Sequence, residues 1–177
     1  MGIRVLALGV LFAALATSAA AASSGPLGVR GQRDGTFSVQ AGRGIFQLQN
    51  VQGSVLGQVD RGKVTITSDA PAIVRGYQSI KIKPSGATLY CCKNVRFRIP
   101  RGKFTVQIDQ GVGVQLSVVG RGKAMMLGAG YAELGLSDGT YQLNDSPNVP
   151  VPDVRTWVQI KAPQPGPPPK QSQLLRP

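Results

Sequence analysis

Residues 95–109 read VRFRIPRGKFTVQID, and this stretch decides the fold class. In residues 95–99 the apolar Val, Phe and Ile alternate with arginine, and in residues 104–109 the apolar Phe, Val and Ile alternate with polar residues. A period of two places the apolar side chains on one face of a β-strand and the polar ones on the other. Both segments are therefore predicted to be strands that have one face in a core and one face in water.

The same alternation recurs on both sides of this stretch, in residues 63–67, 80–83 and 154–161. Glycines next to aspartate or arginine punctuate the apolar runs and predict turns. These pairs are Asp34-Gly35, Arg61-Gly62, Arg101-Gly102, Arg121-Gly122 and Asp138-Gly139. Many short strands between such turns predict one all-β domain over residues 36–162, an antiparallel sandwich or barrel-like double sheet.

The chain also contains an internal repeat. Arg-Gly-Lys begins at residues 61, 101 and 121, and Arg43-Gly44 is a variant, which gives spacings of 18, 40 and 20 residues. The first and last pairs predict two related halves of the domain. A repeat of about 20 residues also fits the coil of a β-solenoid, which is the alternative architecture. The frequent glycine turns favour hairpins and hence the sandwich.

The two ends of the chain differ from the body. Residues 1–22 combine a basic start, an apolar run over residues 5–16 and small residues, which is the pattern of a signal peptide. The apolar run is shorter than the roughly 20 residues that a spanning helix needs. We therefore expect a secreted or extracytoplasmic protein without a transmembrane anchor. Residues 23–35 are predicted to be flexible, and the proline-rich residues 163–177 to be disordered.

The composition limits the chemistry. The 177 residues include 20 Lys and Arg against 8 Asp and Glu, with no histidine, so the formal net charge is +12. A charge of this size attracts polyanions, and export disfavours nucleic acid, which leaves anionic envelope polymers or polysaccharides as expected partners. The absence of histidine removes the commonest general base and metal ligand. We expect no enzyme activity, no metal and no cofactor.

Basic side chains at outward-facing strand positions or strand starts are the main candidate site. Seven residues share this placement and form the predicted polyanion-binding set: Lys63, Lys81, Lys83, Arg96, Arg98, Lys103 and Lys123. If their strands are neighbours, these side chains form one cationic sheet face that holds carboxylates or phosphates. The alternative interpretation is a solvated face that resists aggregation.

Other residues carry alternatives that the sequence leaves open. Trp157 is out of phase with the apolar residues of its strand, so it is a candidate to stack on a sugar or to cover a core edge. On a strand, Cys91 and Cys92 are expected to point to opposite faces, one buried and one exposed. They are candidates for free thiols, a vicinal disulfide or an intermolecular bridge. Glu133 and Asp138 are the one nearby carboxylate pair.

Residues 95–99, taken with residues 102–107, 111–113 and 117–122, carry a resemblance in glycine spacing and strand alternation. They resemble a group of uncharacterised, exported, glycine-rich all-β proteins from actinobacteria. The resemblance implies export and an all-β architecture, and it implies no activity and no site residues.

These observations give a leading hypothesis and two alternatives. The leading one is an exported, non-enzymatic structural or interaction protein of the cell envelope, which forms several salt bridges from a basic sheet face to an anionic polymer. One alternative is an extracellular carbohydrate-active enzyme that uses a carboxylate pair. The other is a surface protein that self-assembles through exposed sheet edges. The sequence leaves the ligand and the oligomeric state open.

Overall fold

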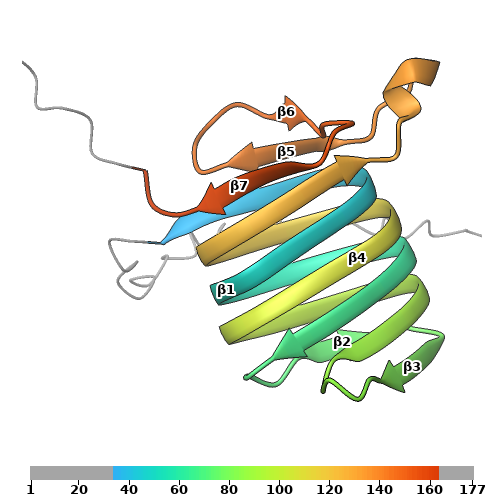
Figure 1. Ribbon diagram of the computed structural model, residues 1–177, viewed down its shortest axis with the longest axis vertical. Helices are drawn as coiled ribbons and strands as arrows, with labels where there is room; N and C mark the ends of the chain where they lie inside the picture. Colours follow the sequence, from blue (N-terminus) through green and yellow to red (C-terminus); the bar gives the residue numbers. More distant parts are fainter. Residues whose placement is uncertain (1–33, 164–177) are drawn as a thin grey trace, which may run out of the picture.

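The computed structural model describes residues 34–163 and is almost entirely β-structure (Figure 1). Its elements are β1 (Gly35–Ser68), β2 (Ile73–Arg75), β3 (Ser79–Ile82), β4 (Thr88–Gly128), the 3-10 helix η1 (Tyr131–Leu134), β5 (Thr140–Leu143), β6 (Val149–Pro150) and β7 (Thr156–Ile160). All pairings are antiparallel and belong to one sheet, which confirms the all-β prediction. The predicted signal peptide, nearly all of the predicted flexible segment and all but the first residue of the predicted disordered tail lie outside the described residues.

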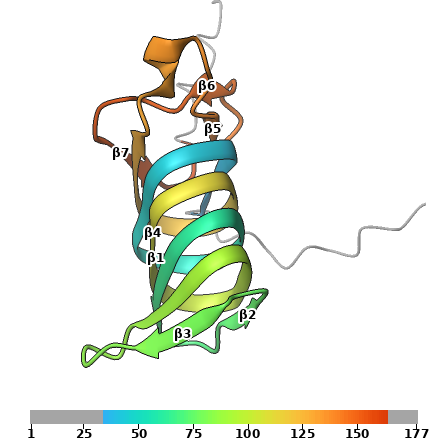
Figure 2. The same ribbon diagram turned by 90° about the vertical axis from the view of Figure 1, so that its right-hand side faces the viewer.

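Two long strands, β1 and β4, make most of the sheet and wind around a common core. Residues of β1 pair with β4 on both sides, because successive turns of β4 lie above and below them (Figures 1 and 2). Phe46 pairs with Ile108 and with Met126, two partners that are 18 residues apart along β4. One turn of the wound ribbon therefore takes about 18 residues, which is close to the repeat spacings of 18 and 20 residues within the two predicted halves.

Bends divide β1 and β4 into segments that alternate between two layers, so the fold is a double sheet as predicted. Layer A contains residues 35–39, 54–59, 95–99 and 115–119, with β2, β5 and β6. Layer B contains residues 44–49, 63–68, 88–91, 104–109 and 123–127, with β3 and β7. The pairing between segments stays within a layer except at the bends, where the continuous strands cross from one layer to the other.

The predicted turns at Arg61-Gly62, Arg101-Gly102 and Arg121-Gly122 are wrong, since all three lie inside β1 or β4. The strand continues through each bend instead of ending in a hairpin. Several bends contain a residue in the left-handed region, such as Ala41 with φ 52° and Gln110 with φ 53°. An extra residue of this kind forms a β-bulge, which bends the strand sharply. It also shifts the alternation of inward and outward side chains by one residue, while the pairing with the neighbouring strands continues.

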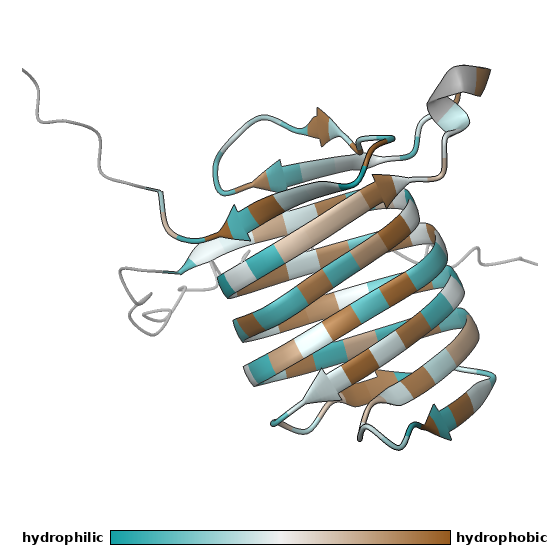
Figure 3. Cartoon of the chain, viewed as in Figure 1, coloured by the Kyte–Doolittle hydropathy of each residue, from teal (hydrophilic) through white to brown (hydrophobic). Residues whose placement is uncertain are grey.

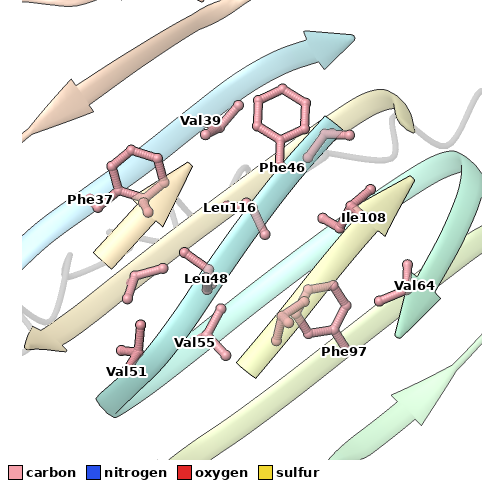
Figure 4. Packing of buried hydrophobic residues seen from close by; sticks show 14 of the residues in the cluster. Phe37, Val39, Phe46, Leu48, Val51, Val55, Val64, Phe97, Ile108 and Leu116 are labelled. Carbon is pink, nitrogen blue, oxygen red and sulfur yellow. The ribbon is translucent and has the colours of Figure 1, made fainter. Parts of the chain in front are cut away.

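The core lies between the two layers and is filled by alternating apolar side chains (Figures 3 and 4). Its largest fully buried members include four phenylalanines: Phe37, Phe46, Phe97 and Phe104. The predicted apolar faces of residues 64–66, 95–99 and 104–108 are confirmed as buried. The prediction is wrong for Ile80 and Ile82, which are 52% and 73% exposed on β3, a strand that pairs with β4 on one side only at one end of layer B.

The predicted strand over residues 154–161 is shorter in the structure. It begins at Thr156 and pairs with β4, while Val154 precedes it and is exposed. Ile160 is buried in the core. Among the described residues no helix has the length and apolar character to cross a membrane.

Candidate polyanion-binding edge

The bends of β1 and β4 stack along two edges of the double sheet. One edge is formed by residues 49–53, 99–103 and 119–123, and we call it the basic edge. The other is formed by residues 41–44, 60–62, 92–94 and 110–113, and we call it the opposite edge. The second and third Arg-Gly-Lys tripeptides lie on the basic edge, whereas the first lies on the opposite edge.

Glycines allow the bends of the basic edge to approach one another closely. Gly53 pairs with both Gly102 and Gly120. A Cβ atom on Gly53 would collide with the Val119 carbonyl oxygen and lie 2.7 Å from the Gly120 Cα. A Cβ atom on Gly102 would lie 2.6 Å from that of Ala70. The glycine of the tripeptide is therefore required by packing, and its basic neighbours point outward.

Five exposed cations occupy the basic edge: Arg101, Lys103, Arg121, Lys123 and Lys161. Lys103 and Arg121 both pair with Gln52, so they lie on the two segments that flank it, about 10 Å apart at the usual strand spacing. Lys161 joins them because it follows β7, whose Ile160 pairs with Gly122. The topology thus gathers cations that are up to 60 residues apart in sequence.

Three shallow hollows run along this edge. The first, of about 230 Å³, is lined by Arg101, Lys103 and Arg121 together with the two carboxylates of the edge. The second, of about 510 Å³, shares Arg121 and adds Lys123 and Lys161. A third, of about 330 Å³, shares Lys103 and is otherwise lined mainly by polar residues. An extended ligand can follow all three, since neighbouring hollows share a basic side chain.

The two carboxylates of the edge, Asp34 and Asp69, already have partners. Asp34 Oδ1 lies 3.3 Å from Arg121 Nε, the one salt bridge among the described residues. Asp69 Oδ1 accepts a hydrogen bond of 2.7 Å from the Lys103 backbone N–H. Four of the five cationic side chains therefore form no salt bridge within residues 34–163, and the edge has a net excess of positive charge.

The structure does not bring the seven predicted basic residues onto one face. Lys103 and Lys123 lie on the basic edge. Arg96 and Arg98 point outward from layer A, because Val95, Phe97 and Ile99 fill the core on the other side of that segment. The remaining three lie elsewhere in layer B or beside it: Lys63 near the opposite edge, Lys81 on β3 and Lys83 just after β3.

Sequence reasoning missed Arg101, Arg121 and Lys161 as candidates. The repeated Arg-Gly-Lys is the signal that could have found the first two, but an arginine next to glycine predicts a turn and not a binding residue. Lys161 lay at the end of a predicted strand with no motif to mark it. Strand phase alone predicts whether a side chain points outward, and it does not predict which bend lies beside which.

The cysteines differ from the expectation of one buried and one exposed side chain. Cys91 and Cys92 are joined in a vicinal disulfide, and both are partly buried near the start of β4. Trp157 is 46% exposed on the outer face of layer B. It pairs with Met125, whose side chain is buried although it lies in the outward phase.

The candidate carboxylate pair lies in and after η1. Glu133 belongs to η1, and Asp138 follows η1 in the chain and is buried. Asp138 Oδ2 accepts hydrogen bonds from the backbone N–H groups of Gly130 at 2.9 Å and Tyr131 at 3.1 Å. This carboxylate therefore organises the loop that follows β4. Within the described residues, no three His, Cys, Asp or Glu side chains cluster in a way that could hold a metal ion.

Comparison of the chain with known protein families, with curated proteins and with solved structures finds no match.

Proposed function

We propose that the protein is an exported binding protein that holds an anionic polymer of the cell envelope along its basic edge, without catalysis. The observation that carries the proposal is the stacking of two Arg-Gly-Lys tripeptides and Lys161 along three connected hollows. Export rests on the signal-peptide pattern of residues 1–22. Mass spectrometry of the protein from the culture medium and envelope of its source should find a chain that begins near residue 23.

Several weak contacts must act together at such a site. An exposed ion pair contributes only about 0–1 kcal/mol, so no single cation of the edge can hold a ligand tightly. A polymer that repeats its charge can contact several of them at once. The arginines add geometric selectivity because a guanidinium can form two parallel hydrogen bonds to a carboxylate or phosphate. The cations project from paired strands, which reduces the conformational entropy lost on binding.

The alternatives have less support from the structure. The carboxylate-pair enzyme would need Asp138 to be accessible, and this side chain is only 4% exposed. Its Oδ2 accepts hydrogen bonds from two backbone N–H groups, and its Oδ1 is buried without a hydrogen-bond partner in the described residues. Self-assembly through sheet edges would need an outermost strand, such as β3, to accept another strand. Lys81 lies within that strand, and edge lysines oppose pairing of this kind.

The test compares two triple variants that carry the same loss of charge. One removes three cations of the basic edge: Arg101→Gln, Lys103→Gln and Lys123→Gln. The control removes three near the opposite edge: Arg61→Gln, Lys63→Gln and Lys93→Gln. The control includes the first Arg-Gly-Lys tripeptide, so sequence context is matched as well as net charge.

Binding is measured by isothermal titration calorimetry with polygalacturonate and with polyphosphate. The unaltered protein should lose at least about tenfold in affinity between low salt and roughly 0.3 M salt, because salt screens exposed charges. The basic-edge triple should bind at least about tenfold more weakly at low salt, a change of about 1.4 kcal/mol. The control triple should stay within about twofold, allowing for the smaller long-range attraction. Equal weakening of both triples, or no binding by the unaltered protein, would refute the proposal.

A further inference from the structure

The outer face of layer A carries a further hollow of about 510 Å³, away from the basic edge, and Arg96 is the one charged side chain that lines it. Six polar side chains that line it matter for its chemistry: Ser38, Gln40, Gln58, Arg96, Gln115 and Ser117. They come from four neighbouring segments of β1 and β4, which are distant in sequence and adjacent in the sheet. No carboxylate side chain lines the hollow.

The pairing register explains the shape of this trough. Gln58 lies between Gln115 and Arg96, so long side chains form one row across the sheet. In the next row Ser38 pairs with Ser117, and the row continues through Leu56 to Arg98. The two short serine side chains therefore leave a depression between the glutamines of the first row and Leu56. The lining residues come from four segments, which together span about 14 Å at the usual strand spacing.

The lining is suited to a ligand rich in hydroxyl groups. Amide and hydroxyl side chains each donate and accept hydrogen bonds, as sugar hydroxyls do. Leu56, which is 60% exposed and also lines the trough, offers apolar surface to the C–H groups of a sugar ring. The backbone groups of these segments are already paired within the sheet, so a peptide strand cannot be added there.

We propose that this trough binds a short stretch of an uncharged oligosaccharide, through the glutamine and serine side chains, with Arg96 at one end. The site is independent of the basic edge, since none of its lining residues borders the three hollows described above. Both sites can therefore be occupied together. The protein would then contact the charged and the neutral polymers of one envelope.

The test uses an array of neutral oligosaccharides, followed by calorimetry with the strongest binder. Neutral hydrogen bonds predict a Kd between about 10 μM and 1 mM that changes less than about twofold when salt is raised. Gln58→Ala with Gln115→Ala should weaken binding at least about tenfold, since neutral hydrogen bonds contribute modestly and two are removed. Ser117→Tyr should abolish binding, because the larger side chain fills the floor of the trough. This second variant tests the proposal independently if the double glutamine variant does not fold.

A matched control exists on the outer face of layer B. Gln47 and Gln107 pair across two strands there, and Gln107 donates a hydrogen bond to Asp109, as Gln58 does to Asp60. Gln47→Ala with Gln107→Ala should leave the affinity unchanged within about twofold, because neither side chain borders the trough. The proposal is overturned if the array shows no binding, or if both glutamine pairs have equal effects. It is also overturned if the basic-edge triple variant is the one that loses oligosaccharide binding.

Discussion

Single glycines decide whether the strands of this protein can bend where they touch. Gly44 lies in a bend of the opposite edge with φ of 130°, a conformation that residues with a Cβ atom rarely adopt. A Cβ atom at this position would also collide with the carbonyl oxygen of Leu127 on β4. The two effects are separate, and rotating a side chain relieves neither, because both involve backbone atoms.

We therefore predict that Gly44→Ala lowers the free energy of unfolding by about 3 kcal/mol, at the high end of the usual range for point mutations. Gly86→Ala is the matched control, since Gly86 also has a positive φ, of 79°, and its Cβ would meet nothing within 4 Å. That change should cost only about 1 kcal/mol. Urea denaturation of both variants measures the difference. Equal losses would mean that φ alone, and not contact with β4, accounts for the effect.

At the scale of strands, burial follows position in the layer more than residue type. Ile82 on β3 and Ile108 on β4 both alternate with polar neighbours in sequence. Ile108 is fully buried because segments of β1 lie on both sides of it and the other layer covers it. Ile82 is 73% exposed on β3, which pairs on one side only. One-sided pairing is not sufficient for exposure, since Ile160 of the outermost strand β7 is buried. A period of two identifies a strand, and it does not show whether that strand is central or outermost.

This difference predicts opposite outcomes for one substitution. Ile108→Ala should lower the free energy of unfolding by about 2–5 kcal/mol, because it leaves a cavity in the core. Ile82→Ala should change it by less than about 0.5 kcal/mol, as surface substitutions usually do. Thermal and urea denaturation provide the measurement. A large loss for Ile82→Ala would show that β3 is covered in solution, for example by a second copy of the chain.

For the whole molecule, winding two long strands around each other makes nearly all pairing non-local. Gly35 pairs with Gly120, and residues of β1 find partners on two successive turns of β4. Such contacts require large loops to close before any pairing stabilises the chain. The same winding stacks the bends and so creates the basic edge, which makes the site a consequence of the complete fold.

We predict that the protein refolds slowly, in milliseconds to seconds or longer, as folds dominated by non-local strand pairing do. Stopped-flow fluorescence of Trp157, the single tryptophan, follows the reaction. Brief unfolding before refolding separates the main phase from proline isomerisation in the unfolded chain. Refolding within microseconds would contradict the prediction.

The sequence by itself determined that residues 95–99 and 104–108 are strands and which of their side chains enter the core. It could do so because alternation is a local property of an extended chain. It also identified Lys103 and Lys123 as outward-facing cations. It did not show that Arg101-Gly102 is a bend inside one strand, since the same dipeptide is common in turns.

Only the tertiary structure decided which cations meet. The tripeptides that begin at Arg101 and Arg121 share the basic edge, while the identical tripeptide that begins at Arg61 lies on the opposite one. The physical reason is that strand phase shows only whether a side chain points toward the core. Which bend lies next to which depends on the register of β1 against two turns of β4, and that register comes from pairing between residues far apart in the chain.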